Sequence, residues 1–289
     1  LNLLLGLFSK RPLQVIIYRN PKMKSAIQGL IQEDNPTIYA FLIRMIEYVQ
    51  DIKDCYRIAD LTDCISMEYE RRLDYLRWIH RFIYAFEAKR LRELEQSVSA
   101  LCDESWFISA IDRNILGLET SNCHVVPNST KLYPHQKDYR YYGKMMFVGR
   151  MSVAHNIHSV QYVRDNLLDT ILAKYPKLTF DIVGACPPKI IRNMDGSKNT
   201  KVHGFVDDLL GALAECDVFV APMFFSAGMQ NKVLEAMAVG VPVVMTENVA
   251  ESIGCRDKLH YLKAGNKDEF IARIFGLLDD SDLRAKIGT

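Results

Sequence analysis

One stretch of the chain, residues 217–247, constrains the fold more than any other. It begins with an apolar run from Asp217 to Pro222 whose residue types favour a strand, and the proline cannot continue a ladder. A helical pattern follows from Met229 to about Val239 and stops at Gly240. Val241 to Thr246 is a second apolar run. Two apolar strands joined by an amphipathic helix form a βαβ unit, which predicts a parallel sheet covered on both faces.

The polar side of this predicted helix carries a functional signal. Asn231, Lys232 and Glu235 project within roughly 100° of one another, opposite the apolar stripe. They lie in the first two turns, where free backbone N–H groups favour a bound anion, and Gly228 allows the backbone to approach closely. A phosphate there would meet Lys232, and Glu235 would accept from a sugar hydroxyl. The alternative is a solvated lysine–glutamate pair, which is the commoner arrangement when such a motif stands alone.

The sequence GMQNKVLEAMAVGVPVV that begins at Gly228, in this order of elements, resembles the donor-binding core of GT-B glycosyltransferases of the large retaining family 4. The resemblance is greatest to the bacterial branch active in exopolysaccharide assembly. It implies that Glu235 holds the nucleotide ribose and that the backbone of Gly228, Met229 and Gln230 lies against the diphosphate and the sugar. Family members often carry a further glutamate that contacts the donor hexose. The matching position here is Ala227, so the hexose stays unassigned.

Composition limits the class of protein. A chain of 289 residues with 49% hydrophobic content is long enough for two domains, and a net charge of +1 gives no argument for nucleic-acid binding. Seven scattered cysteines without a CxxC motif indicate reduced thiols in a cytosolic protein. No run of 18 apolar residues is present, and Leu1–Phe8 is too short to span a bilayer and lacks the features of a signal peptide.

The first part of the chain, residues 1–122, alternates strand and helix patterns, which predicts a Rossmann-like domain. The resemblance implies that it is a partial domain on the acceptor side. Strands are expected at Gln14–Arg19, Thr37–Arg44, Tyr56–Asp63, Ser105–Ser109 and His124–Pro127, with a helix from Pro21 to about Gln32 and a long charged helical region from Met67 to Ala100. No glycine-rich turn precedes Gln14, and no final helix returns to the first domain. By resemblance we therefore expect a chain truncated at both ends.

Residues 71–92 combine a basic excess with aromatic side chains. They hold seven basic residues (Arg71, Arg72, Arg77, Arg81, Lys89, Arg90 and Arg92) against Asp74 and Glu87, with Tyr75, Trp78, Phe82 and Phe86 between them. The favoured interpretation is an amphipathic helix with core aromatics and solvated arginines. The alternative is a peripheral membrane contact with anionic headgroups at the inner face, which would bring the protein to a lipid-linked acceptor.

After an expected interdomain linker at 123–143, residues 144–289 predict a second Rossmann-like domain that binds the donor. Its first strand, Lys144–Arg150, ends in Gly149-Arg150 at the carboxyl edge, where ligands of open α/β sheets bind. The resemblance implies that Arg150 clamps the donor diphosphate and that Gly204-Phe205 forms the shelf for the base. The alternatives are an exposed strand-end arginine and an ordinary turn with a core aromatic. Further elements are expected as helices at Asn156–Tyr175, Pro188–Met194 and Asn266–Asp280, and as strands at Leu178–Ala185, Thr200–Val206 and Lys258–Ala264.

Other chemistry-bearing patterns are weak. His155 and His158 have the spacing of a zinc pair on a helix but no evident third ligand, and Asp280-Ser281-Asp282 is better explained by capping of a terminal helix. No G-x-G-x-x-G, P-loop or G-x-S-x-G is present, so no motif supports a dehydrogenase, a P-loop kinase or an α/β-hydrolase. No metal site is predicted.

The fold expected from these features is α/β: a GT-B arrangement of two Rossmann-like domains with parallel sheets facing across a cleft. The resemblance implies a cytoplasmic, metal-independent retaining hexosyltransferase without a cofactor, acting on a UDP- or GDP-linked sugar and a glycan or lipid-linked acceptor. Arg150 and Lys232 would stabilise the leaving diphosphate and Glu235 would orient the ribose. The donor-binding residues would be Gly149, Gly204, Phe205, Gly228, Met229, Gln230 and Asn231. Two alternatives stay open: a nucleotide-sugar 2-epimerase on the same fold, and an inactive module that binds a nucleotide sugar or a partner.

Overall fold

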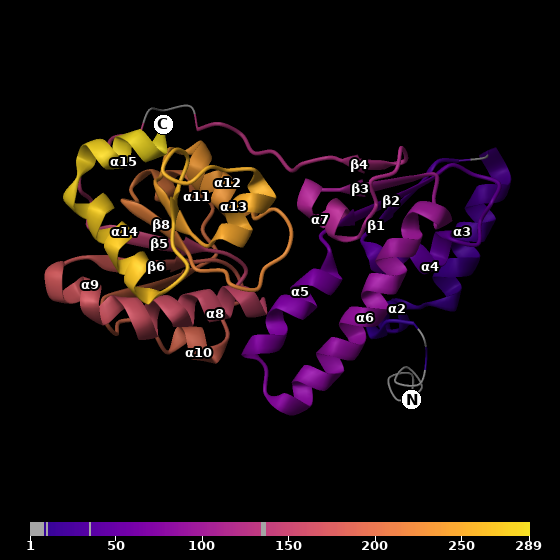
Figure 1. The fold of residues 1–289 in the computed structure, drawn as a ribbon, viewed down its shortest axis with the longest axis horizontal. Coiled ribbons are helices and arrows are strands. Elements are labelled where there is room, and N and C mark those ends of the chain that lie inside the picture. Colours follow the sequence, from indigo (N-terminus) through magenta and orange to yellow (C-terminus); the bar gives the residue numbers. More distant parts are fainter. Residues whose placement is uncertain (1–8, 10, 35, 134–136) are drawn as a thin grey trace. The chain divides into compact units, whose positions relative to one another are not determined.

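The fold was analysed in a computed structural model, which describes residues 9, 11–34, 36–133 and 137–289 (Figure 1). The expectation for Leu1–Phe8 lies outside these residues. The chain divides into two compact units, one formed by Leu1–Asn128 with Ala227–Met229 and the other by Ser129–Ser226 with Gln230–Thr289. Within the described ranges, no helix is both long and apolar enough to cross a membrane.

The first unit is built on a four-stranded sheet of order β1-β2-β3-β4 in which every pair is parallel. Its strands are β1 (Ile38–Phe41), β2 (Arg57–Thr62), β3 (Glu104–Phe107) and β4 (Cys123–Val125). Its helices are α2 (Leu13–Tyr18), α3 (Pro21–Asp34), η1 (Ile43–Met45), α4 (Ile46–Val49), α5 (Ile65–Arg72), η2 (Leu73–Tyr75), α6 (Trp78–Leu101) and α7 (Ala110–Ile115). The expected helix at Pro21 and four of the expected strands are confirmed. Strand β4 lies inside the range expected to be linker.

The strand expected at Gln14–Arg19 is wrong, because this segment forms the short helix α2. An apolar run of five or six residues fits a strand and a buried helix equally well by its periodicity. Packing decides between them here. Val15 is the buried residue of α2, and the backbone N–H of Leu13 donates to Glu87 in α6 instead of to a neighbouring strand.

The helical region expected from Met67 to Ala100 is interrupted, which also corrects the interpretation of its aromatics as core residues. α5 ends at Arg72, and the chain turns through η2 and an extended Leu76 before α6 begins at Trp78. α5 and α6 run side by side in Figure 1, and the end where they join projects away from the sheet of this unit. Trp78 is 70% exposed and Phe82 73%. The side chains that are buried on α6 come mainly from its second half.

The core of the first unit includes one residue from far along the chain. Ala227 is buried in the cluster formed by the sheet and its helices, together with residues such as Leu61 and Phe107. Gly228 has a φ of 67°, and a Cβ at this position would collide with the carboxylate of Asp63. Only glycine suits that backbone conformation and that contact.

The second unit has a six-stranded parallel sheet of order β10-β9-β8-β5-β6-β7. The strands are β5 (Lys144–Val148), β6 (Thr179–Val183), β7 (Thr200–Gly204), β8 (Val218–Ala221), β9 (Val243–Met245) and β10 (Leu262–Lys263). Every strand expected in this half is confirmed. The order is that of a doubly wound sheet, and the winding reverses between β5 and β8.

Helices cover both faces of this sheet, as expected for a parallel sheet. They are α8 (Ala154–Tyr162), the π-helical η3 (Val163–Leu167), α9 (Leu168–Lys174), α10 (Lys189–Arg192), α11 (Leu209–Ala214), α12 (Asn231–Ala238), α13 (Glu247–Ile253), α14 (Lys267–Asp279) and α15 (Ser281–Gly288). In Figure 1, α8 and α9 lie on one side of the sheet and α12 and α13 on the other. Asp280 accepts from the N–H groups of Asp282 and Leu283, which confirms that it caps α15.

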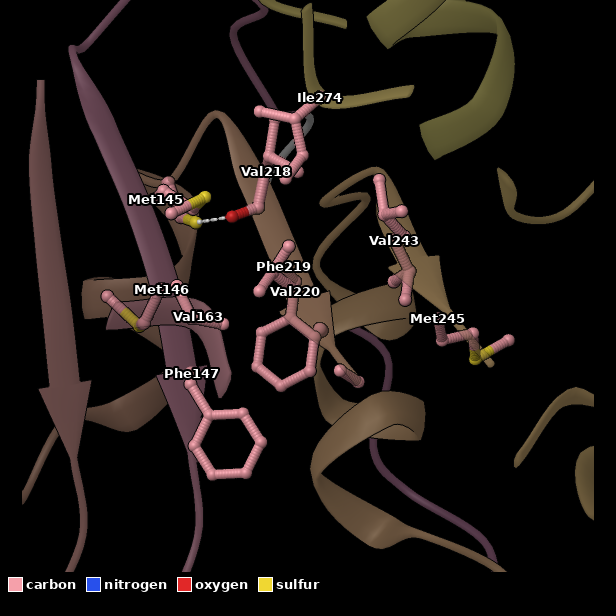
Figure 2. Close-up of a cluster of buried hydrophobic side chains, with 14 of the residues drawn as sticks. Met145, Met146, Phe147, Val163, Val218, Phe219, Val220, Val243, Met245 and Ile274 are labelled. Atoms are coloured by element: carbon pink, nitrogen blue, oxygen red, sulfur yellow. Dashed lines mark hydrogen bonds between the residues drawn. The ribbon is translucent and has the colours of Figure 1, made fainter. Parts of the chain in front are cut away.

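The core of this unit lies around the two central strands. Figure 2 shows Phe147 of β5 beside Phe219 of β8, with Val220, Val243 and Met245 continuing the apolar layer. The two rings are stacked, with centroids 6.4 Å apart. Burial of a large apolar side chain stabilises a fold by roughly 1.5–3 kcal/mol. These strands therefore provide a rigid base for the loops that follow them.

Candidate functional site

The candidate site lies at the carboxyl ends of β5 and β8, where the winding of the sheet reverses. Neighbouring strands here carry connections that leave in opposite directions, and open α/β sheets bind their ligands at such a point. β5 is followed by Gly149-Arg150, and β8 is followed by a loop that leads to α12. The sequence-predicted residues Arg150, Gln230, Asn231, Lys232 and Glu235 all belong to these two segments.

Close backbone packing brings the elements of this site together. A Cβ on Gly149 would come within 2.8 Å of Nδ2 of Asn156, and one on Gly184 would collide with the carbonyl oxygen of Gly149. The N–H of Gly149 donates to the carbonyl of Val183 at 3.0 Å. Because Gly149 has no side chain, Asn156 at the start of α8 can lie directly against the end of β5.

Arg150 is exposed at the end of β5. Its Nε donates to Oγ of Ser152 at 3.1 Å, and none of the ion pairs found among the described residues involves it. The guanidinium therefore keeps donors for a ligand. A planar guanidinium at the carboxyl edge of a sheet suits a bidentate contact with phosphate.

Lys232 is placed differently from the solvated lysine of the alternative interpretation. Its Nζ donates to Oδ1 of Asn156 at 2.6 Å and to Oε1 of Gln230 at 3.0 Å, and it lies 5.5 Å from the centroid of the Phe147 ring. Desolvation lowers the pKa of Lys232 to about 7, and the charge of Glu235 only partly opposes that shift. A bound anion would favour the charged form and raise this pKa again.

Glu235 lies one turn after Lys232 on α12. Its pKa is raised by burial, and the charge of Lys232 works in the opposite direction. The side-chain hydrogen bonds and ion pairs found across the described part of the chain include none to this carboxylate, and none joins it to Lys232. A carboxylate with free acceptor capacity in a half-buried position is suited to neutral hydroxyl donors such as those of a ribose.

The start of α12 presents the positive end of a helix dipole. Gln230 precedes the helix with extended backbone angles, and its side chain makes no capping hydrogen bond to the helix. Gln230 itself is buried, whereas Asn231 is exposed. The positive end of the helix dipole at an N-terminus favours a negatively charged ligand.

The other sequence-predicted residues lie apart from this group. Gly204 ends β7 with a φ of 69°, and Phe205 is 74% exposed, so it is not the core aromatic of the alternative interpretation. Gly228 and Met229 belong to the first unit by their packing. The structure therefore brings Arg150, Gln230, Asn231, Lys232 and Glu235 together within the second unit, with Gly149 beneath them.

Sequence reasoning missed Asn156 as a member of the site. It is 3% exposed, its Nδ2 donates to the carbonyl of Arg150 at 3.0 Å, and its Oδ1 accepts from Lys232. One amide thus links the loop after β5 to the lysine of α12. An asparagine among ordinary helix residues gives no signal of such a role before the fold is known.

The loop between β8 and α12 is held by polar side chains from neighbouring elements. The carbonyl of Met223 accepts from Oγ1 of Thr246 at 3.1 Å and from Nδ2 of Asn248 at 2.8 Å, and the carbonyl of Pro222 accepts from Oγ of Ser159 at 3.0 Å. These bonds satisfy buried carbonyls and fix the path of the loop toward α12.

No cluster of three or more potential metal ligands is found in the ranges that the structure describes. His158 packs its ring against Phe225 with centroids 5.1 Å apart, and burial lowers its pKa. His158 is therefore part of the packing around the loop that follows β8.

Comparison with known families gives one match, which lies in the second unit. Residues 143–280, slightly less than half of the chain, match the family model described as "Glycosyl transferases group 1". No curated protein sequence matches significantly.

Solved structures match over both units. The crystal structure of TarM has a TM-score of 0.71 at 14% identity over 92% of this chain and 52% of that protein. Anabaena Alr3699/HepE, solved in complex with UDP and glucose, gives 0.67 at 14% identity over 93% of this chain and 74% of that one. Sucrose-phosphate synthase from Thermosynechococcus elongatus has a TM-score of 0.66 at 13% identity, over 93% of this chain and 71% of that one.

The chain thus spans about half the length of TarM. At such low identity these matches establish the fold. With two units on parallel sheets, the chain has the GT-B fold, and its residues 143–280 match the family model of the glycosyl transferases group 1.

Proposed function

We propose that this chain is part of a retaining glycosyltransferase that moves a hexose from a UDP- or GDP-linked sugar to a glycan or lipid-linked acceptor. The observation that carries the proposal is the grouping of Arg150, Lys232 and the N-terminus of α12 beside the carboxylate of Glu235, which forms no ion pair with Lys232. Cations next to a hydroxyl-binding carboxylate suit a nucleoside diphosphate better than a simple phosphate. The complex of Alr3699/HepE with UDP and glucose supports a donor of this class.

Each residue has a distinct part in the proposed chemistry. Cleavage of the bond between sugar and diphosphate leaves growing negative charge on the diphosphate oxygens. Arg150 and Lys232 would stabilise that charge, and preorganised cations of this kind act most strongly where charge develops in the transition state. Asn156 and Gln230 fix the position of the Lys232 amine before the donor arrives.

Glu235 would hold the ribose hydroxyls, and Phe205 would offer its exposed ring to the base. These contacts are made equally in the ground state and in the transition state, so they belong to donor binding and not to the chemical step. The resemblance to retaining enzymes suggests that an oxygen of the leaving phosphate deprotonates the acceptor, with no protein nucleophile. Two protein cations could then suffice without a metal ion.

Calorimetry of the whole chain with UDP, GDP and ADP tests the proposed donor site. We expect one of these nucleotides to bind with a micromolar to low millimolar dissociation constant, unchanged by EDTA. Lys232→Met should weaken binding by roughly tenfold or more, because a charge-assisted contact to phosphate is lost.

Glu235→Gln keeps the shape of the side chain. It should weaken the binding of UDP much more than the binding of inorganic diphosphate, since only UDP carries a ribose. Leu259→Ser, an exposed position after α13, serves as the matched control. Absence of binding below millimolar concentrations for all three nucleotides would remove the donor-site assignment. Binding that collapses with EDTA would remove metal independence.

A further inference from the structure

An apolar stripe on the first three turns of α6 faces solvent. It consists of Trp78, Ile79, Phe82, Ile83 and Phe86, which are 70%, 54%, 73%, 44% and 49% exposed. We call these five residues the α6 stripe. Scattered apolar side chains are normal on a protein surface, whereas five adjacent large ones on a single helix mark an interaction site.

The α6 stripe lies on the solvent side of the helix, whereas the apolar residues of a helix packed on a core usually face that core. At about 100° per residue the five positions span about 140° of the helix. Glu87, Ala88 and Leu91, which are buried against the rest of the unit, lie on the opposite side. Phe86 contacts the guanidinium of Arg90 at 4.0 Å, but none of the five side chains belongs to the hydrophobic core of the first unit, so the stripe needs another reason to be apolar.

Cationic side chains lie on one side of the stripe, at Arg77 and Arg81, and just beyond its last residue, at Lys89. Arg77, Arg81 and Lys89 are all exposed. Arg81 lies 3.5 Å from Asp74 with both side chains more than half exposed, and such a pair contributes little. By contrast, Arg90 and Arg92 further along α6 pair with Glu87 and Glu70. The bordering cations thus keep most of their charge available for an external anion.

Charge decides which occupant fits the stripe. A second copy of the chain packed stripe to stripe would bring six of these cations together, and Arg81 would keep only the exposed pair with Asp74 in each copy. An anionic surface satisfies them all at once. Aromatic and aliphatic residues on one face of a helix with arginine and lysine along its borders are typical of helices that lie in the plane of a membrane interface.

We propose that the first three turns of α6 dock on the surface of a bilayer that carries anionic lipid. The rings of Trp78, Phe82 and Phe86 would enter the boundary between headgroups and acyl chains, and Arg77, Arg81 and Lys89 would contact lipid phosphates. Figure 1 shows that this part of α6 lies at the projecting end of the α5–α6 pair, away from the sheet of its own unit. The geometry suits insertion of a tip without unfolding of the unit.

Binding of vesicles, measured without any nucleotide, tests this proposal separately from the proposed function. The chain has two tryptophans, Trp78 and Trp106. In a Trp106→Phe background the fluorescence reports only Trp78. We expect a blue shift and co-sedimentation with phosphatidylcholine vesicles that contain about one-third phosphatidylglycerol, and much weaker effects with phosphatidylcholine alone.

Two sets of variants separate the contributions of charge and of apolar contact. Each of Arg77→Gln, Arg81→Gln and Lys89→Gln should weaken vesicle binding by about fivefold, with less effect at high salt. Phe82→Ser with Phe86→Ser should abolish the blue shift of Trp78. Leu30→Ser on α3 removes an apolar side chain that is 68% exposed and should change nothing. Circular dichroism checks that every variant is folded.

Several results would overturn the membrane proposal. One is an unchanged Trp78 spectrum at saturating anionic lipid. Another is equal binding to neutral and anionic vesicles, which would remove the role of the cations. A third is a dimer of the wild-type chain in sedimentation velocity, a monomer for the Phe82→Ser, Phe86→Ser variant, and no binding of vesicles by either. This result would assign the stripe to a second copy of the chain.

Discussion

At the scale of single residues, Lys232 is held by two neutral amide oxygens, so its ammonium form gains no formed ion pair to offset burial. The pKa of about 7 lies below the ordinary value of 10.5, and the unfolded chain therefore binds more protons between these two pH values. Lys232 accordingly makes the free energy of unfolding rise with pH from about 7 to 10.5, and its burial costs most below pH 7.

The same pKa makes donor binding a proton-linked event. A diphosphate stabilises the charged amine, so we expect binding of UDP at pH 8 to take up close to one proton, and binding at pH 6, where the amine is already charged, to take up little. Calorimetry in buffers with different ionisation enthalpies measures this number directly. Lys232→Met should reduce the uptake at pH 8 to near zero. Equal uptake by the variant would assign the proton to another group.

The position of Lys232 and Glu235 near the start of one helix could be predicted from the sequence, because the helical pattern from Met229 to Val239 places them one turn apart. The enclosure of Lys232 could not, since it depends on Asn156 from another helix and on Phe147 beneath it. Periodicity placed the lysine on a polar face, and the true environment is set by elements more than 70 residues away in sequence.

At the scale of elements, continuously apolar runs predicted strands more reliably than any other pattern predicted its element. Every expected strand of the second unit is present because strands covered on both faces admit few polar residues. α2 was predicted as a strand because a short apolar run lacks a decisive period. The break between α5 and α6 has no proline or glycine to announce it, and Leu76 takes an extended conformation there.

Two glycines of the second unit should respond to substitution by alanine in opposite ways, one because of a close backbone contact and the other because of helix propensity. Gly184, with a φ of 151°, has the carbonyl of Gly149 where a Cβ would stand, so Gly184→Ala should destabilise the protein by more than about 2 kcal/mol. Gly276 lies within α14 with only Leu283 near its Cβ direction, at 3.7 Å. Gly276→Ala should stabilise by about 0.5–1 kcal/mol. Urea unfolding measures both. A neutral Gly184→Ala would show that the close contact of the two strand ends relaxes at no cost.

At the scale of the whole molecule, the alternation of strands and helices predicted two α/β units, and the reversal of winding in the second unit placed the candidate site at one edge of its sheet. Which residues pack with which unit could not be predicted. Ala227 is far closer in sequence to β8 than to any strand of the first unit, and it is nevertheless buried in the core of the first unit.

Separate cores predict that a nucleotide protects one unit more than the other. Trp78 and Trp106 both lie in the first unit, so tryptophan fluorescence follows its unfolding, whereas far-ultraviolet circular dichroism follows both units. UDP at a hundred times its dissociation constant should stabilise the second unit by about 2.7 kcal/mol and raise its thermal midpoint by about 5–10 °C. The fluorescence midpoint should move by much less. Equal shifts of both midpoints would show that the units unfold as one cooperative structure. A shift of the fluorescence midpoint alone would place the nucleotide on the first unit and contradict a donor site formed by Arg150, Lys232 and Glu235.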